Sequence, residues 1–239
     1  MGPGFLNHHL HFLGVSATLK GVGRINVRPG SSDVNVFRQV FTGFQFSLGQ
    51  YPQGQRVMDL YDQMVAGGRT PLILDLGANN GASALWFRST YPAAHIVAVE
   101  PEPSNARVLR DNTERFGVEV VEAAIGSSSG SVNICDDGEE WGFTTTRSDT
   151  GATPIVTIDA ILEGHPNTEL FIVKVDIEGF ESDLFATNLE WLADVSVVLI
   201  EPHDWKFPGI GTSAAFQRAF GERDFEILLR DENVVYVRR

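Results

Sequence analysis

From residue 70 onward, short apolar runs alternate with stretches in which apolar residues recur at helical spacing. This alternation is typical of a parallel sheet with crossover helices, because parallel strands cannot be joined by a tight turn. We therefore expect one doubly wound α/β domain. The expected core strands are residues 72–76, 95–100, 118–121, 170–177 and 195–201, the helices residues 80–90, 103–116, 159–163, 180–187 and 212–220, and a terminal hairpin residues 225–229 and 234–237.

Other regions precede or interrupt this pattern. Residues 1–50 show no sustained period and are interpreted as an N-terminal extension that could form part of a lid over substrate or cofactor. An amphipathic helix over residues 55–65 opens the main domain, residues 51–239. Residues 127–157 are rich in Ser, Gly and Asp and contain β-type runs, which predicts an inserted set of antiparallel strands.

Charge and composition exclude several function classes. The 239-residue chain has 31 acidic and 18 basic residues, which argues against nucleic acid as a partner, because phosphate binders need a basic face. Without an apolar run of roughly 20 residues or a secretory signal, we expect a cytoplasmic protein with no membrane partner. Cys135 is the only cysteine, fits a reducing compartment and is interpreted as a partly buried apolar residue. His8, His9 and His11 could hold a metal, but a mobile tail is the favoured interpretation because acidic and cysteine partners are missing nearby.

The first core strand leads into a glycine turn, residues 75–81, and then into a helix. Gly77 and Gly81 permit a tight turn and close approach of a ligand, and the helix start offers unpaired N–H groups. The G-x-G-x-x-G spacing of nicotinamide enzymes is absent, which weakens a dinucleotide interpretation. The candidate cofactor-binding residues in this turn are Asp75, Gly77, Ala78, Asn79 and Gly81.

A carboxylate closes the second strand at Glu100-Pro101, about 20 residues after the turn, where α/β nucleotide sites keep an acid for the ribose hydroxyls. Glu100 is therefore the leading cofactor-binding candidate, with Pro101 beside it, and a surface glutamate is the alternative. Small side chains close the third strand over residues 122–126, where Ala124 could help to form a flat slot for an adenine ring.

The fourth strand carries Lys174, Asp176 and Glu178, which strand alternation places on one side, with Phe171 and Val173 on the other. A lysine within a parallel strand is expected to be buried, which is costly unless a carboxylate pairs with it. We interpret Lys174 as a charge partner behind the two carboxylates. A structural ion pair between sheet and helix is the alternative.

The fifth strand delivers Glu201 and His203 at its carboxyl end. If the first, fourth and fifth strands are neighbours, both residues share one rim with Asp75, Asp176 and Glu178. His203 could deprotonate a hydroxyl, since the pKa of imidazole lies near neutrality. The same groups could instead hold a divalent cation, and both hypotheses stay open. The candidate catalytic residues are Lys174, Asp176, Glu178, Glu201 and His203.

These motifs resemble the FkbM family of S-adenosylmethionine-dependent methyltransferases. The glycine turn is shared by many methyltransferases, whereas the Lys-x-Asp-x-Glu-Gly-x-Glu strand exit is much more diagnostic. Asn80 and Phe180 depart from the family, which often has an apolar residue and a small residue at these places. The matching segments occur in the family's order, within roughly residues 50–203, and are residues 74–81, 99–101, 123–126, 157–159 and 173–181.

The resemblance implies a class I methyltransferase fold, a Rossmann-like sheet of seven mostly parallel strands with helices on both faces and the last strand antiparallel. It also implies S-adenosylmethionine as cofactor and methyl transfer, usually to a hydroxyl oxygen of a small molecule, sugar, glycan or natural product. Trp141 and Phe143 of the insertion are expected either to lean over the acceptor or to anchor the hairpin. A nicotinamide-dependent oxidoreductase and a non-catalytic nucleotide-binding module are the alternatives on a similar sheet.

Overall fold

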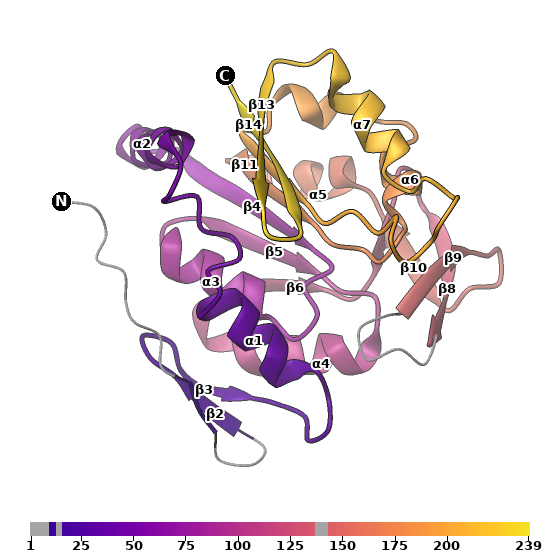
Figure 1. Cartoon of the computed structure of the whole chain (residues 1–239), viewed down its shortest axis with the longest axis horizontal. Coiled ribbons are helices and arrows are strands. Elements are labelled where there is room, and N and C mark those ends of the chain that lie inside the picture. The colour runs from indigo at the N-terminus through magenta and orange to yellow at the C-terminus, as the bar shows by residue number, and fades with distance from the viewer. Residues whose placement is uncertain (1–9, 13–15, 137–142) are drawn as a thin grey trace.

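A seven-stranded sheet in the order β13-β14-β12-β11-β4-β5-β6 forms the centre of the molecule (Figure 1). The computed structural model describes residues 10–12, 16–136 and 143–239. The strands from β12 to β6 are parallel, whereas β14 runs antiparallel to both neighbours. The expected sheet with an antiparallel last strand is confirmed. Its strands are β4 (Thr70–Leu76), β5 (His95–Val99), β6 (Glu119–Val121), β11 (Thr168–Val175), β12 (Val197–Ile200), β13 (Phe225–Arg230) and β14 (Asn233–Arg238).

The strand order reverses between β4 and β11. After β4 the chain adds β5 and β6 on one side, and then returns to place β11 and β12 on the other. In open α/β sheets the crevice beyond the carboxyl ends of the strands at such a point is where ligands bind. The first, fourth and fifth core strands, β4, β11 and β12, are therefore neighbours at the place where a site is expected.

Helices cover both faces of the sheet and create two cores (Figure 1). Alternation along β4 assigns its side chains to them, since Ile73 packs in one core and Leu72 and Leu74 in the other. None of the described helices combines the length and the apolar character needed to cross a membrane. The first core lies under α1 (Asp33–Phe41), α2 (Pro52–Ala66), α3 (Ala82–Thr90) and α4 (Pro103–Thr113), and the second under α5 (Ile158–Gly164), α6 (Glu181–Leu184) and α7 (Ala214–Gly221).

Strand β11 departs from the expected regular alternation. Its register with β4 shifts between Leu170 and Ile172, and this bulge places Phe171 in the core opposite to that of Val173. The prediction that Phe171 and Val173 share a face is therefore wrong. The strand also ends at Val175, so the following acidic segment is a loop and α6 is shorter than expected.

The insertion forms a small separate sheet in the order β7-β10-β8-β9, with β7 (Ala124–Ile125), β8 (Gly130–Asp136), β9 (Phe143–Arg147) and β10 (Thr153–Val156). The runs expected to pair antiparallel do so, β8 with β9 and with β10. Strand β7, which precedes the expected insertion at residues 127–157, adds a parallel strand beside β10. Trp141 and the side chain of Phe143 lie outside the described residues.

The N-terminal extension contains regular structure that its sequence did not reveal. Strands β1 (Leu10–Phe12), β2 (Ser16–Leu19) and β3 (Gly23–Asn26) form an antiparallel sheet, and α1 follows. Strands of three or four residues are too short to show a period. Leu19 and Phe37 are fully buried in the core that α3 also covers. The proposed histidine cluster, His8, His9 and the side chain of His11, lies outside the described residues.

Candidate active site

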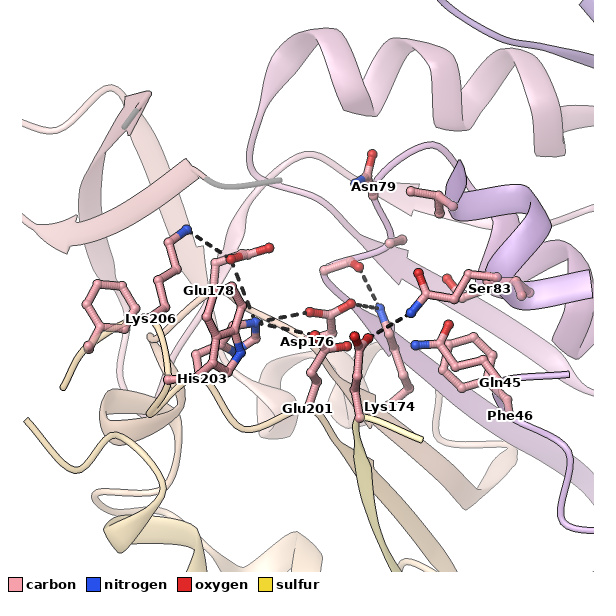
Figure 2. A pocket seen from close by; sticks show the side chains of 18 residues that line it. Gln45, Phe46, Asn79, Ser83, Lys174, Asp176, Glu178, Glu201, His203 and Lys206 are labelled. Carbon is pink, nitrogen blue, oxygen red and sulfur yellow. Dashed lines mark hydrogen bonds and ion pairs between the residues drawn. The ribbon is translucent and has the colours of Figure 1, made fainter. Parts of the chain in front are cut away.

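A cavity of about 830 Å³ lies at the carboxyl ends of β4, β11 and β12 (Figure 2). Its volume is within the roughly 300–1,000 Å³ of small-molecule sites. Segments that are distant in sequence line it, among them the glycine turn after β4, the end of β11 with the residues after it, the end of α1 with the residues after it, and the loop that follows β12. The cavity is therefore large enough for a cofactor or substrate, and the N-terminal extension forms part of its wall.

The glycine turn approaches the end of β11 so closely that only glycine fits at position 77. A Cβ atom on Gly77 would lie 1.7 Å from the carbonyl oxygen of Asp176, and its φ is 76°. The amides of Gly77 and Ala78 donate to the Val99 carbonyl, which ties the turn to β5. Gly77, Ala78 and Asn79 line the cavity, whereas Gly81 packs against α4.

Glu100 is buried beside the turn and braces it. Its Oε2 accepts from the Asn79 amide at 2.8 Å, and its Oε1 accepts from the Glu102 amide at 3.0 Å and from the Asn105 side chain at 3.3 Å. Burial raises the pKa of Glu100 to about 7, against these hydrogen bonds. Glu100, Pro101 and Ala124 lie outside the lining of this cavity, and Ala124 packs in the core of the small sheet.

Lys174 lies between two carboxylates under the glycine turn. Its ammonium is 3.3 Å from Asp75 Oδ1 and from Asp176 Oδ2, and donates to the Gly77 carbonyl at 2.6 Å. Burial alone would lower the pKa of Lys174, but the charges of Asp176 and Asp75 outweigh it and raise the pKa above its ordinary value. Asp75 is fully buried and accepts from Ser83 at 2.6 Å. Lys174 lines the cavity, whereas Asp75 holds it from behind and does not line the cavity.

Glu178 and Glu201 add further carboxylates to the wall. Glu178 has a left-handed backbone with φ of 54°, which is rare for a residue with a side chain. Its Oε2 accepts from Lys206 at 3.1 Å, and burial and Asp176 raise its pKa. Glu201 has a pKa raised to about 8 by burial and then by Asp176. The wall therefore holds more carboxyl groups than can easily be ionised at the same time.

His203 is held by a carboxylate that the sequence-based assignment of site residues omitted. Its Nδ1 lies 2.8 Å from Oε1 of Glu181, and both side chains are buried. The Nε2 atom faces Asp176 and Glu178 at 3.7 Å and Glu201 at 3.9 Å (Figure 2). Burial would lower the pKa of His203, but the hydrogen bond to Glu181 and the nearby carboxylates raise it to about 9. Glu181 is the last residue of the strand-exit motif, which was the signal for it.

The grouping of Asp176, Glu178 and His203 brings possible ligand atoms together for a metal ion. Two ammonium groups already neutralise its carboxylates, since Lys174 lies 3.3 Å from Asp176 and Lys206 lies 3.1 Å from Glu178. A divalent cation would therefore have to compete with two resident positive charges.

Asn80 joins the glycine turn to the N-terminal extension. Its side-chain amide lies 3.2 Å from Oδ1 of Asp33, which in turn forms an ion pair of 2.7 Å with Arg28. Asn112 completes the junction by donating to the Asn80 carbonyl and accepting from the Asn26 amide. A polar residue at position 80, where the family often has an apolar one, is explained by these hydrogen bonds, which anchor the segment that carries α1 to the glycine turn.

The loop after β12 brings aromatic groups to the mouth of the cavity. Trp205 lines the cavity with 72% of its surface exposed, and its ring centroid is 6.5 Å from that of His203. Phe207 lines the cavity nearby and packs against Gly179. On the other side of the cavity, the side chain of Gln39 in α1 donates to Glu232 of the β13–β14 hairpin at 2.7 Å. Both of these residues line the cavity.

One family model and two curated relatives show what this chain is similar to. The family model described as the Methyltransferase FkbM domain matches residues 75–227. The hexuronic acid methyltransferase AglP of Haloferax volcanii is 28% identical over 172 residues, covering 70% of each chain. The methyltransferase sdnD of Sordaria araneosa is 27% identical over 103 residues, covering 41% of this chain and 34% of its own. Among solved structures, monomeric WbdD is similar at 16% identity with a TM-score of 0.44, covering 77% of this chain and 41% of that one.

Proposed function

This chain belongs to the FkbM methyltransferase family, and we propose that it transfers the methyl group of S-adenosylmethionine to a hydroxyl oxygen of a sugar or a related small molecule. The observation that carries the proposal is the imidazole of His203, whose Nε2 is turned toward a cavity of cofactor size by the buried Glu181. The name of one relative, a hexuronic acid methyltransferase, supports a sugar acceptor.

The chemistry of the cavity fits the cofactor. The glycine turn leaves backbone exposed along one wall, because a Cβ atom at Gly77 would collide with the Asp176 carbonyl. S-adenosylmethionine carries positive charge on its sulfonium and amino groups, and the carboxylates of Asp176, Glu178 and Glu201 line the same cavity. We assign the amino-acid end to the Gly77–Asn79 turn and the ribose to the side of Glu100.

The cofactor supplies an activated methyl group, which an acceptor oxygen can take in a single in-line displacement. The protein must then align the acceptor and remove its proton. We assign the proton to Nε2 of His203. Because Nδ1 donates to Glu181, the neutral ring has its lone pair on Nε2, and Glu181 stabilises the imidazolium formed as the proton arrives.

The acceptor is assigned to the side of the cavity that Trp205 borders. An exposed indole at a cavity mouth offers a flat apolar surface, which suits the C–H face of a sugar ring while the ring hydroxyls reach polar groups. Trp205 lies next to His203, so an acceptor stacked on it would hold a hydroxyl close to the base.

We assign the lid to the N-terminal extension. Val36, Gln39 and Val40 of α1 line the cavity, and Gln39 reaches the β13–β14 hairpin through Glu232. Ligand sites that exclude water strengthen the electrostatic interactions inside them. Residues 16–50 share a core with the main sheet, which supports one cooperative unit in which the extension forms a wall of the site.

The test begins with calorimetric titration of the purified chain with S-adenosylhomocysteine, S-adenosylmethionine and the nicotinamide cofactors. Saturable binding of the first two alone is expected. Incubation with S-adenosylmethionine and a panel of hexuronic and neutral sugars should then give a methyl ether, which mass spectrometry and cleavage with base distinguish from a methyl ester. Binding of nicotinamide cofactors alone would overturn the proposal, and a methyl ester as the product would overturn the assignment of a hydroxyl acceptor.

A cation-dependent mechanism is the competing hypothesis for the same rim. If the residues around His203 hold a cation, a chelator should abolish turnover and Mg²⁺ or Mn²⁺ should restore it. We expect turnover to survive chelation, because Lys174 and Lys206 already neutralise Asp176 and Glu178.

A further inference from the structure

A second group of possible metal ligands lies at the other end of the parallel strands from the cavity. It consists of His95, Glu119 and His165. His95 opens β5, Glu119 opens β6, and His165 follows the last residue of α5. The cavity lies at the carboxyl ends of the parallel strands, whereas this cluster lies at their amino-terminal ends. The cluster shares no residue with the candidate active site.

The fold brings these three side chains onto one face of the sheet. Glu119 pairs with Val97 of β5, and His95 precedes Val97 by two residues, so His95 and Glu119 project to the same side. Val97 belongs to the core that α5 covers, and the end of α5 therefore delivers His165 to that side. The convergence combines residues from two strands and a helix end.

Both imidazoles meet a single carboxylate oxygen. Nε2 of His165 is 3.0 Å and Nε2 of His95 is 3.2 Å from Oε2 of Glu119. The two ring centroids are 4.8 Å apart, and the three ligand atoms all lie within 4.8 Å of one another. The side chains remain 17–45% exposed, so an ion could reach them from solvent.

One hydrogen bond fixes which nitrogen of His165 is free. Its Nδ1 lies 2.7 Å from the Ile161 carbonyl, which only accepts, so Nδ1 must carry the proton in the neutral ring. The lone pair of Nε2 then points at the Glu119 oxygen, and two lone pairs at 3.0 Å repel each other unless a proton or a cation lies between them. A backbone carbonyl holding the second nitrogen is the usual support of a metal-binding histidine.

We propose that His95, Glu119 and His165 bind zinc or a similar transition-metal ion, at a site separate from methyl transfer. Two imidazoles and a carboxylate are a donor set that zinc uses, with water in the fourth place. Tetrahedral bonds of about 2.0–2.2 Å place ligand atoms about 3.3 Å apart. The observed separations of 3.0 and 3.2 Å approach that spacing. Mg²⁺ and Ca²⁺ prefer oxygen ligands and should not bind here.

The test is a titration of the chelator-treated full chain with Co²⁺, followed by visible absorbance and competed with Zn²⁺. All variants are made in a background with His8, His9 and His11 replaced by Ala, because these three histidines near the N-terminus could also bind metal. One Co²⁺ per chain with the intense absorbance of a tetrahedral site, displaced by Zn²⁺, is expected. Mg²⁺ should not compete.

The variants His165→Ala and Glu119→Gln in that background should each weaken Zn²⁺ binding by more than about 100-fold, since even supporting groups cost 10–100-fold. Circular dichroism without metal checks that they fold, and Glu119→Gln keeps the side-chain size if His165→Ala does not. The matched control is His203→Ala, which alters the other cluster and should leave Zn²⁺ affinity unchanged. Undiminished binding in His165→Ala and Glu119→Gln, or loss in His203→Ala alone, would overturn the proposal.

Discussion

Glu181 accepts a hydrogen bond from His203 in the interior of the protein, with Nδ1 of the imidazole 2.8 Å from Oε1 of the carboxylate. Glu181 is fully buried and His203 is 1% exposed. The pair joins the end of the strand-exit motif after β11 to the loop after β12, two segments that meet only because their strands are neighbours. It fixes the ring so that Nε2 faces the cavity.

The first prediction concerns the base itself. His203→Ala should lower turnover by about 10²–10⁴-fold while cofactor affinity is largely kept, because general-base catalysis contributes that much. Glu181→Gln keeps the shape of the partner but removes its charge, so a smaller loss is expected. Single-turnover methyl transfer and calorimetry check both. A fully active His203→Ala enzyme that ignores chelators would exclude both the base and the cation mechanism.

The second prediction is a pH dependence. The pKa of His203 is raised to about 9, so the neutral base becomes more abundant as pH rises and the rate should climb toward that value. Glu181→Gln should move this rise to lower pH, because the buried charge that favours the imidazolium is removed. Rates measured under saturating cofactor and acceptor check this. A rate that is flat from neutral pH upward contradicts His203 as the base.

Stability should change over the same pH window, with the opposite sign. The charged form of His203 is favoured in the folded state, so its contribution is complete below the ordinary pKa of 6.5 and is lost as pH rises through about 9. Glu201 acts in the same direction. Its pKa is raised to about 8, so the folded state keeps a proton on Glu201 at lower pH, and the stability that this gives is lost as pH rises through about 8. The melting temperature of the wild type should therefore fall toward alkaline pH, and that of His203→Ala should fall less.

The fourth prediction concerns Glu100. Glu100→Ala should leave the fold intact and lower cofactor affinity at least about tenfold, since hydrogen bonds to a charged acceptor contribute roughly 1.5–3 kcal/mol each. The loss has two physical sources: the ribose contacts proposed for Glu100 and its support of the Asn79 amide. Glu102→Ala is the matched control, because it removes the neighbouring carboxylate and a helix cap but keeps Glu100. Equal affinity in Glu100→Ala and wild type would remove Glu100 from the site.

The fifth prediction separates stability from chemistry at Lys174. Lys174→Met leaves Asp75 buried without its charge partner, so a loss of roughly 3–5 kcal/mol of unfolding free energy is expected. Lys206→Met should cost less, because its partner Glu178 is partly exposed to water. Urea unfolding of both variants measures the difference. A Lys174→Met variant that is stable but inactive would instead make Lys174 a candidate for the base.

The alternation of apolar runs determined the sheet, because a buried parallel strand must be apolar on both faces and must be followed by a crossover. The glycine turn determined where a ligand could approach, since position 77 cannot hold a side chain beside the Asp176 carbonyl. The carboxylates at the ends of the second, fourth and fifth strands could likewise be found from their spacing. Strand order then brings those of the fourth and fifth strands, Asp176 and Glu201, to one rim.

Tertiary structure decided what period and spacing do not encode. The bulge in β11 moved Phe171 to the other core, because one extra residue in a strand reverses the faces that follow it. The polar junction of Asn80 with Asp33 placed an extension without sequence period against the cavity. The orientation of His203 came from Glu181, 22 residues away in sequence. Contacts of this kind depend on the packing of whole elements, whereas period and turn chemistry act within a few neighbouring residues.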